Sequence, residues 1–284
     1  MNDSIHDLLA EATGALSAAG IPDARMEAAF LLSRVLNRDR TFIIAHPEYP
    51  LTADQLQEFR DFIARRAHGE PSQYITGRQE FFGLGFAVTP DVLIPRPESE
   101  LIVEAALKLA TSDPRLLIAD IGTGSGCLIV SLLQELRQAR GIATDISFRA
   151  LRVAEGNAQL HRVIERLRFV QADSFSAFAS RPLFSLIVSN PPYVPTTEVD
   201  NLQREVRDHE PMSALLSGSD GLAQIRVLLS EAPRFLLPHG YVVFEIGFGQ
   251  SKAVEEIIDA AVWNLIEIRN DLQNIPRTFV LQKR

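Results

Sequence analysis

The chain has one cysteine among its 284 residues, and this scarcity excludes several classes of protein. A single thiol, Cys127, permits no internal disulfide, so a small secreted domain held together by disulfides is excluded. Zinc sites built from several cysteines are excluded for the same reason. The six histidines are scattered and show no metal-ligand spacing, so we expect no metal site.

Long apolar runs and an excess of positive charge are also missing. No uninterrupted apolar stretch approaches the roughly 20 residues that a helix needs to cross a bilayer. Acidic residues, among them Asp7 and Glu11, occupy the region where a signal peptide would be basic and then apolar. The net charge of -8 disfavours a protein that binds nucleic acid mainly through phosphates. We expect a cytoplasmic protein with no direct contact to membrane or nucleic acid.

The composition allows a sizeable core, because 46% of the residues are hydrophobic, and the length is compatible with two domains. Residues 1–74 show helical periodicity only, for example over residues 5–16. Thr52 and Gln55 have the spacing of a capping box that opens a later helix. We expect a small helical bundle with either a structural role or a role in recognising the substrate.

Residues 75–95 differ in character, because bulky apolar residues mix with glycine and proline. A β-hairpin connector is predicted by this mixture, in which the apolar residues are Phe81, Phe82, Leu84, Phe86, Val88 and Val92 and the others are Gly77, Gly83, Gly85 and Pro90. The sequence Ile-Pro-Arg-Pro-Glu-Ser-Glu follows at residues 94–100, and its two prolines predict a rigid turn ahead of a helix that begins near residue 101. The sequence leaves open whether Arg96 and Glu98 contact a ligand or only water.

From residue 96 to 284, predicted strands alternate with predicted helices. The expected strands are 116–120, 141–145, 167–173, 184–190, 241–246, 265–269 and 278–282. The expected helices are 101–110, 125–138, 147–159 and 220–236. This alternation predicts an α/β fold with a doubly wound, mostly parallel seven-stranded sheet and right-handed crossovers. A short polar turn separates the last two strands, so we expect a hairpin that leaves one strand antiparallel.

A glycine-rich loop follows the first strand of this sheet and opens a helix. Its residues after Asp120 and Ile121 are Gly122, Thr123, Gly124, Ser125 and Gly126. Glycines allow the backbone to turn tightly and to approach a ligand closely. The spacing matches neither the G-x-G-x-x-G dinucleotide motif nor a phosphate-binding loop that ends in Lys and Ser or Thr.

Three later strands also end in polar residues, namely Asp145, Asp173 and Asn190. Asp145 follows Gly126 by close to the ~20 residues at which an acid meets ribose hydroxyls. A carboxylate at Asp173 can accept a hydrogen bond from the exocyclic amine of adenine. Each residue alone is also typical of a turn or a helix cap. Since strand ends meet at one sheet edge, the four together predict a site for an adenosine-containing cofactor.

The sequence Asn190-Pro191-Pro192-Tyr193 ends the strand predicted at 184–190. Prolines cannot donate to a sheet ladder, so they stop the strand and place Asn190 on a stiff turn. The Asn190 side-chain oxygen and a backbone carbonyl offer two acceptors that converge on one substrate NH2 group. The ring of Tyr193 can lie against a flat group. The alternative is a turn that merely ends a strand.

Together, these motifs resemble those of class I methyltransferases that use S-adenosylmethionine, and the Asn-Pro-Pro-Tyr sequence resembles that of enzymes acting on planar NH2 groups. Further segments narrow the resemblance, namely residues 23–36, 80–84, 94–100 and 210–211. With them, nearly the whole chain is similar to the release-factor glutamine methyltransferase family, PrmC or HemK.

The resemblance implies a Rossmann-like enzyme of translation termination. It would methylate N5 of the glutamine in the Gly-Gly-Gln motif of class I peptide chain release factors, with S-adenosylhomocysteine as the product. The residues implied to bind the cofactor are Gly122, Thr123, Gly124, Ser125 and Gly126 at the methionine part, Asp145 at the ribose, Asp173 and Ser174 at the adenine, and Asn190. Relatives often carry an aromatic residue at the position of Ser174, so Phe175 is a second candidate there.

The substrate glutamine would be held by Asn190, Pro191, Pro192 and Tyr193, of which Asn190, Pro191 and Tyr193 are implied to be catalytic. Two other substrates stay open. One is the glutamine of a ribosomal protein, although the related enzymes carry Pro-Arg-Ser-Pro where residues 95–98 are Pro-Arg-Pro-Glu. The other is an exocyclic amine of nucleic acid. We expect a monomer, and the sequence assigns no role to Glu245.

Overall fold

The computed structural model describes residues 4–110 and 116–284, whose contacts form two compact units. The first unit is Met1–Arg78 with Gln203–His209, and the second is Gln79–Leu202 with Glu210–Arg284. Residues 1–3 of the predicted helical domain lie outside the described residues. The domain boundaries expected at residues 74 and 95 stay predictions.

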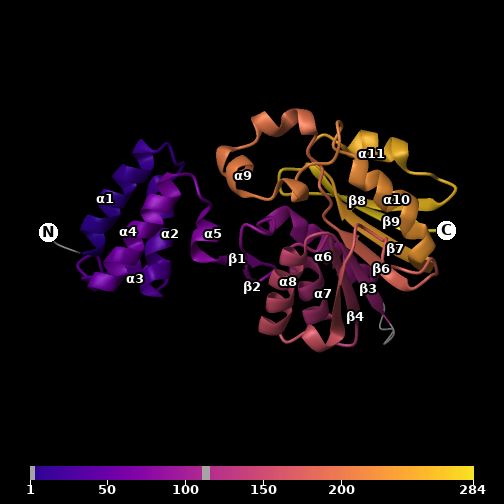
Figure 1. Ribbon diagram of the computed structural model, residues 1–284, viewed down its shortest axis with the longest axis horizontal. Coiled ribbons are helices and arrows are strands. Elements are labelled where there is room, and N and C mark those ends of the chain that lie inside the picture. The colour runs from indigo at the N-terminus through magenta and orange to yellow at the C-terminus, as the bar shows by residue number, and fades with distance from the viewer. Residues whose placement is uncertain (1–3, 111–115) are drawn as a thin grey trace. The chain divides into compact units, whose positions relative to one another are not determined.

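The first unit is the expected bundle of helices (Figure 1). Its N-terminal helices are α1 (Ile5–Ala18), α2 (Ala24–Leu36), α3 (Arg40–Ala45), α4 (Ala53–Ala67) and α5 (Ser72–Thr76). The predicted capping box is present, since Gln55 N donates to Thr52 Oγ1 and Thr52 N donates to Gln55 Oε1. Leu31, Leu32 and Phe59 are buried in its apolar core.

A sixth helix of this unit, α9 (Arg204–His209), comes from much later in the chain. It is held by Arg66 of α4, whose side chain is buried. The Arg66 guanidinium lies 2.9 Å from a carboxylate oxygen of Glu27 in α2 and 2.9 Å from one of Glu205 in α9. A buried guanidinium needs such partners, because an unpaired buried charge is strongly destabilising. No local pattern in the sequence indicated this contact.

A β-hairpin is present within residues 75–95, as predicted. It consists of β1 (Arg78–Phe81) and β2 (Leu84–Ala87). The turn residues Phe82 and Gly83 have φ of +51° and +71°, and positive φ at both central residues is typical of a tight hairpin turn.

Asn157 of helix α8 (Phe148–Leu160) holds this hairpin in place. Its fully buried side chain accepts a hydrogen bond from Ala87 N at 2.7 Å and donates to Ala87 O at 3.0 Å. It also donates to Ser125 O at 2.8 Å. The side chain therefore joins β2 to the glycine-rich loop.

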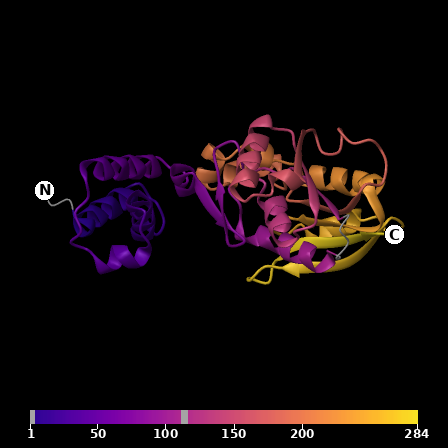
Figure 2. The ribbon, with the colours of Figure 1, turned by 90° about the horizontal axis from the view of Figure 1, so that it is seen from below.

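The second unit contains the predicted seven-stranded sheet, with strand order β5-β4-β3-β6-β7-β9-β8. The strands are β3 (Leu117–Ile121), β4 (Arg140–Asp145), β5 (Leu167–Gln171), β6 (Phe184–Ser189), β7 (Leu236–Glu245), β8 (Trp263–Asn270) and β9 (Pro276–Lys283). Only β9 runs antiparallel to its neighbours, as the predicted hairpin requires. Figure 2 shows these last strands side by side in yellow.

Helices cover both faces of the sheet, which makes the fold doubly wound (Figure 1). Along β6, Leu186 and Val188 pack with α6 (Glu100–Leu109), α7 (Cys127–Glu135) and α8. Ile187 points to the other face, where α10 (Ala223–Phe235) and α11 (Ser251–Ile257) lie. The short 3-10 helices are Pro97–Ser99, Ile164–Arg166, Thr196–Asn201 and Met212–Ala214.

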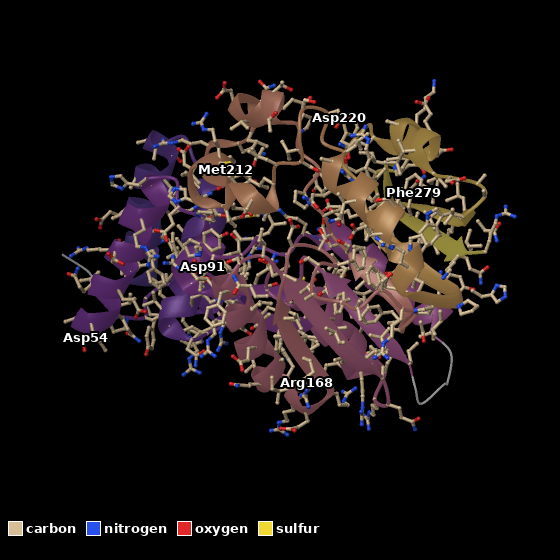
Figure 3. All side chains as sticks on the ribbon, turned by 45° about the vertical axis from the view of Figure 1, so that its right-hand side comes forward. Asp54, Asp91, Arg168, Met212, Asp220 and Phe279 are labelled. Atoms are coloured by element: carbon tan, nitrogen blue, oxygen red, sulfur yellow. The ribbon has the colours of Figure 1, made fainter. Side chains whose placement is uncertain are left out.

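Aromatic stacking adds to the core of the second face. Phe279 of β9, labelled in Figure 3, is fully buried and stacks on Phe244 of β7 with ring centroids 5.7 Å apart. None of the helices in residues 4–110 and 116–284 is long and apolar enough to cross a membrane.

The order in which strands are added to the sheet reverses between the parallel strands β3 and β6, because β4 and β5 lie on one side of β3, and β6 and β7 lie on the other. In open α/β sheets, such a point leaves a crevice outside the carboxyl ends of the strands. The ends of β3 and β6 are joined there, since Ser189 Oγ donates to Ile121 O at 2.7 Å.

Two glycines of this unit provide a matched test of the packing. A β-carbon at Gly141 of β4 would lie 2.9 Å from Ile129 and 2.8 Å from Leu167 side-chain atoms, whereas one at exposed Gly156 of α8 meets nothing within 4 Å. We expect Gly141→Ala to lower the free energy of unfolding by about 1–3 kcal/mol. Gly156→Ala should raise it by roughly 0.5–1 kcal/mol. Denaturant unfolding measures both, and equal effects would contradict the packing described here.

Candidate functional site

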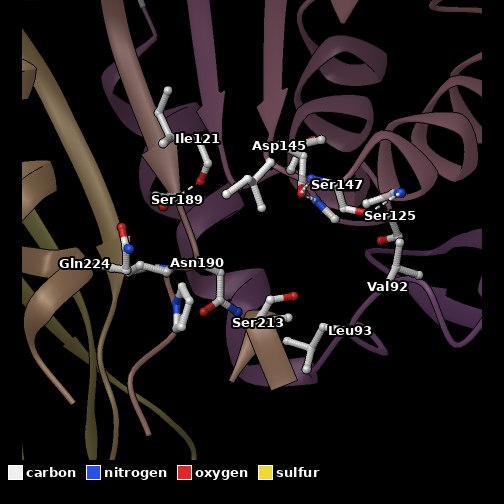
Figure 4. Close-up of a pocket in the computed structure, with 18 of the residues that line it drawn as sticks. Val92, Leu93, Ile121, Ser125, Asp145, Ser147, Ser189, Asn190, Ser213 and Gln224 are labelled. Carbon is white, nitrogen blue, oxygen red and sulfur yellow. Dashed lines mark hydrogen bonds between the residues drawn. The ribbon is translucent and has the colours of Figure 1, made fainter. Parts of the chain in front are cut away.

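A cavity of about 340 Å³ opens at the carboxyl ends of β3, β4 and β6 (Figure 4). Its volume lies in the range of small-molecule sites, roughly 300–1,000 Å³. The predicted site residues that line it are Gly122, Thr123, Gly124, Ser125, Asp145, Asp173, Ser174, Asn190, Pro191 and Pro192. Gly126 and Tyr193 are not among the lining residues.

The glycine-rich loop leaves its backbone open to the cavity. Gly122 and Gly124 have φ of +74° and +53°, and a β-carbon at either position would meet no atom within 4 Å. Gly126 has a different reason to be glycine, because its β-carbon would lie 3.1 Å from Ala154 Cβ in α8. The missing side chain lets α7 begin close against α8.

Two carboxylates accept hydrogen bonds from residues of this loop. Asp145 accepts hydrogen bonds from Gly124 N and from Ser147 N, both at 2.9 Å, which orient it at the cavity wall. Asp120 is fully buried and accepts a hydrogen bond from Thr123 Oγ1 at 2.6 Å. Burial raises the pKa of Asp145 and raises the pKa of Asp120 to about 7.

Two of the residues that follow β5, Asp173 and Ser174, are accessible to solvent. Asp173 is exposed at the cavity, and Ser174 Oγ donates to Asp173 Oδ1 at 3.2 Å. Ser174 has φ of +50°, so the backbone turns sharply at this point. Phe175 lines the cavity, but its buried ring stacks on Phe235 with centroids 4.9 Å apart. Most of that ring therefore belongs to the core.

Asn190 lines the cavity together with Ser213 and Gln224 (Figure 4). Its Nδ2 donates to Ser99 Oγ at 2.8 Å, and the Ser99 hydroxyl donates to Glu245 Oε2 at 2.5 Å. Within the described residues, neither Asn190 Oδ1 nor the Pro191 carbonyl oxygen accepts a hydrogen bond. These two oxygens are therefore available to a ligand.

Tyr193 does not line the cavity, and residues of the loop after β7 hold it in place. Its hydroxyl lies near the Glu245 carboxylate, and its backbone oxygen accepts from Gln250 Nε2 at 2.9 Å. A β-carbon at Gly247 would lie only 3.0 Å from Tyr193 Cδ2, so the loop after β7 packs directly on the ring. Burial and the nearby Glu245 carboxylate raise the pKa of the Tyr193 hydroxyl, which stays protonated.

Glu245 was not among the predicted site residues. It ends β7, is 1% exposed, accepts a hydrogen bond from the Ser99 hydroxyl and lies near Tyr193. Burial raises the pKa of Glu245 to about 7. The signal that could have found it is the one that identified Asp145, a single polar residue at the end of an apolar strand.

A second buried carboxylate ties residues 94–100 to the cavity wall. Glu210 is 5% exposed, accepts from Ile94 N at 3.3 Å and pairs with the Arg96 guanidinium. The next residues, Pro211 and Ser213, line the cavity. Through its ion pair with Glu210, Arg96 therefore helps to hold Pro211 and Ser213 in the cavity wall.

The residues at this site do not support a mechanism with a cysteine nucleophile or with a metal ion bound by the protein. Burial raises the pKa of the Cys127 thiol to about 12, so no thiolate forms near neutral pH. Across the parts of the chain that the structure describes, no cluster of three His, Cys, Asp or Glu residues is arranged to hold a metal ion. The site offers hydrogen-bond acceptors and an open glycine backbone.

Comparison with solved structures supports the fold. One similar structure, the hMettl16 catalytic domain in complex with a MAT2A 3'UTR hairpin, has a TM-score of 0.57 at 12% identity over 89% of this chain and 90% of that one. Another, a methyltransferase from Pyrococcus furiosus, has a TM-score of 0.52 at 17% identity over 71% and 90%. At these identities, the likeness concerns the fold alone.

Sequence comparison is more specific. The PrmC N-terminal domain model matches residues 7–77, and the methyltransferase small domain model matches residues 99–207. The chain is 42% identical to the release factor glutamine methyltransferase of Koribacter versatilis, over 94% of each chain. It is 38% identical to that of Nitratidesulfovibrio vulgaris, over 99% of this chain and 95% of that one. The chain therefore belongs to the release factor glutamine methyltransferase family.

Proposed function

We propose that this protein methylates the side-chain N5 of the glutamine in the Gly-Gly-Gln motif of class I peptide chain release factors, with S-adenosylmethionine as the methyl donor. The observation that carries the proposal is the pair of available acceptors, Asn190 Oδ1 and the Pro191 carbonyl, beside a glycine-lined cavity. The relatives described above bear the name of this activity.

The residues present fit a nucleoside cofactor. The cavity of about 340 Å³ is open at Gly122 and Gly124, where a β-carbon would meet nothing, and a carboxylate stands at the end of the next strand. In this proposal Gly122–Gly126 line the methionine part, Asp145 accepts from the ribose hydroxyls, and Asp173 and Ser174 flank the adenine. When bound, S-adenosylmethionine supplies an electrophilic methyl group on a sulfonium.

The protein's own task is to orient a poor nucleophile. A glutamine amide nitrogen has its lone pair delocalised into the carbonyl, so it reacts only if it is held in line. Asn190 Oδ1 and Pro191 O accept its two N–H groups and fix the nitrogen in position. This is catalysis by orientation and electrostatic preorganisation. Tyr193 stays a predicted contact for the plane of the substrate amide, and Pro192 stiffens the loop.

The same acceptors select the substrate. A side chain that lacks an NH2 group leaves both acceptors unpaired, at about 1–3 kcal/mol for each one that is buried. An amide or an aromatic amine satisfies them, so the acceptors alone do not distinguish glutamine from a nucleobase. The family to which the chain belongs favours glutamine.

The decisive experiment offers radiolabelled cofactor with separate candidate substrates: a class I release factor, a ribosomal protein fraction and DNA. We expect label on the release factor alone, at the Gly-Gly-Gln glutamine, as located by peptide mass spectrometry. Replacing that glutamine in the release factor should abolish labelling. Label on the ribosomal fraction or on DNA, with none on the release factor, would overturn the proposal.

Removing the amide tests the acceptor role directly. We expect Asn190→Ala to lower kcat by about 10²–10³, the loss seen when one preorganised hydrogen-bonding group is removed. Affinity for S-adenosylhomocysteine, measured by calorimetry, should change little. Asn264→Ala on β8, at an edge of the sheet, is the matched control and should leave kcat unchanged. An Asn190→Ala enzyme with a near wild-type rate would exclude this assignment.

Asp145→Ala tests the cofactor site. Loss of a charged acceptor for two hydroxyls should weaken cofactor binding by about 10- to 100-fold, corresponding to roughly 1.5–3 kcal/mol. Because Asp145 also accepts from Gly124 N and Ser147 N, thermal unfolding must first show that the variant is folded. Unchanged affinity in a folded variant would remove Asp145 from the site.

A further inference from the structure

Glu245 is a buried carboxylate that the chemistry proposed above does not use. It accepts a hydrogen bond from the hydroxyl of Ser99 in the 94–100 segment, and Tyr193 of the loop after β6 lies near it. The other charged side chains near it are Glu98 and Arg277. Ser99 is itself 2% exposed and accepts from Asn190 Nδ2. A continuous buried chain of hydrogen bonds thus joins Asn190 to Glu245.

When Glu245 is ionised, the hydrogens available to these three side chains permit one arrangement of donors and acceptors. An ionised carboxylate only accepts, and a serine hydroxyl has a single hydrogen to donate. Ser99 donates that hydrogen to Glu245, so toward Asn190 it can act only as an acceptor. Asn190 must then turn its NH2 group to Ser99. Its oxygen is the end that remains for the cavity.

We propose that Glu245 and Ser99 are positioning residues that hold the Asn190 amide with its oxygen toward the substrate, and that they thereby make the site select a glutamine over a glutamate. This inference rests on the proposed function, since it concerns the orientation of the residue that receives the glutamine NH2. It also gives the 94–100 segment a role, because Ser99 is its contribution to the site.

Glutamate is the informative competitor because its side chain has nearly the shape of glutamine but two acceptor oxygens instead of one acceptor and one donor. Facing Asn190 Oδ1, a carboxylate is repelled. It would bind well only if the Asn190 amide turned over and offered its NH2 group. That turn would set Oδ1 against the Ser99 lone pairs, so Ser99 prevents it.

The test compares binding of two ligands to the enzyme loaded with S-adenosylhomocysteine. One is a class I release factor with its Gly-Gly-Gln motif, and the other is the same protein with that glutamine replaced by glutamate. Affinities are measured by calorimetry at about pH 8.5, above the raised pKa of Glu245, so that its carboxylate is ionised. The readout is the ratio of the two dissociation constants.

In the wild-type enzyme we expect the glutamine form to bind more tightly by tenfold or more, about the effect of leaving one buried polar group unpaired. In Ser99→Ala the amide is free to turn, so this preference should fall by about tenfold, mainly because the glutamate form binds better. Glu245→Gln should shift the ratio in the same direction, since a glutamine can donate its NH2 group to Ser99 and leave the Ser99 hydrogen free for a turned Asn190 oxygen. Ser99→Thr, which keeps the hydroxyl, should restore the preference.

Ser131→Ala is the matched control. Ser131 is a fully buried serine of α7 whose hydroxyl has no hydrogen-bond partner in the described chain. Its replacement should leave the ratio unchanged. A merely structural role of Ser99 would weaken both ligands in parallel and also leave the ratio unchanged, which would overturn the inference.

Different results would contradict the proposed function and the positioning role of Ser99 and Glu245. If the wild-type enzyme neither binds nor methylates the release factor, the proposed function fails. If the wild type prefers the glutamine form and both folded variants, Ser99→Ala and Glu245→Gln, retain that preference, the positioning role alone is wrong.

Discussion

The site depends on one constraint, that polar groups buried at the carboxyl edge of the sheet must find hydrogen-bond partners there. Glu245 is the clearest case, because it lies at the end of an apolar strand and is removed from water. It is satisfied by the hydroxyl of Ser99, which comes from the segment before α6. The need of one buried carboxylate thus joins two segments that are 146 residues apart in the chain, and Ser99 in turn accepts from the amide that faces the cavity.

Other buried groups connect the parts of each unit in the same way. Asn157 joins the β1–β2 hairpin to the glycine-rich loop, and Glu210 joins Arg96 to the wall of the cavity. In the helical unit, Arg66 draws α9 into contact with α4. Each of these side chains has a partner in a segment that is distant in the sequence and that no short-range pattern relates to it. Breaking one of them leaves an unpaired buried group, which is more damaging than the loss of an exposed pair.

Much of the fold could be predicted, because hydrophobic period and turn residues report on local structure. The seven strands lie within a few residues of their expected positions, and the capping box at Thr52 is present. The residues at the strand ends could be predicted as a group for a topological reason, since parallel strands direct their carboxyl ends to one edge. The packing of Gly126 against Ala154 and of Tyr193 against Gly247 could not be predicted, because the local sequence does not reveal these neighbours.

The sequence by itself determined the fold class, the glycine-rich loop, the order of polar strand ends and, through its resemblance, the family. These are properties of short segments, and their physical causes are local backbone preferences and the alternation of apolar residues. Only the tertiary structure decided which end of the Asn190 amide faces the cavity, because that choice is made by Ser99 and Glu245, which approach Asn190 from other segments. A hydrogen-bond direction is set by every partner in the chain of donors and acceptors, and those partners meet only once the chain has folded.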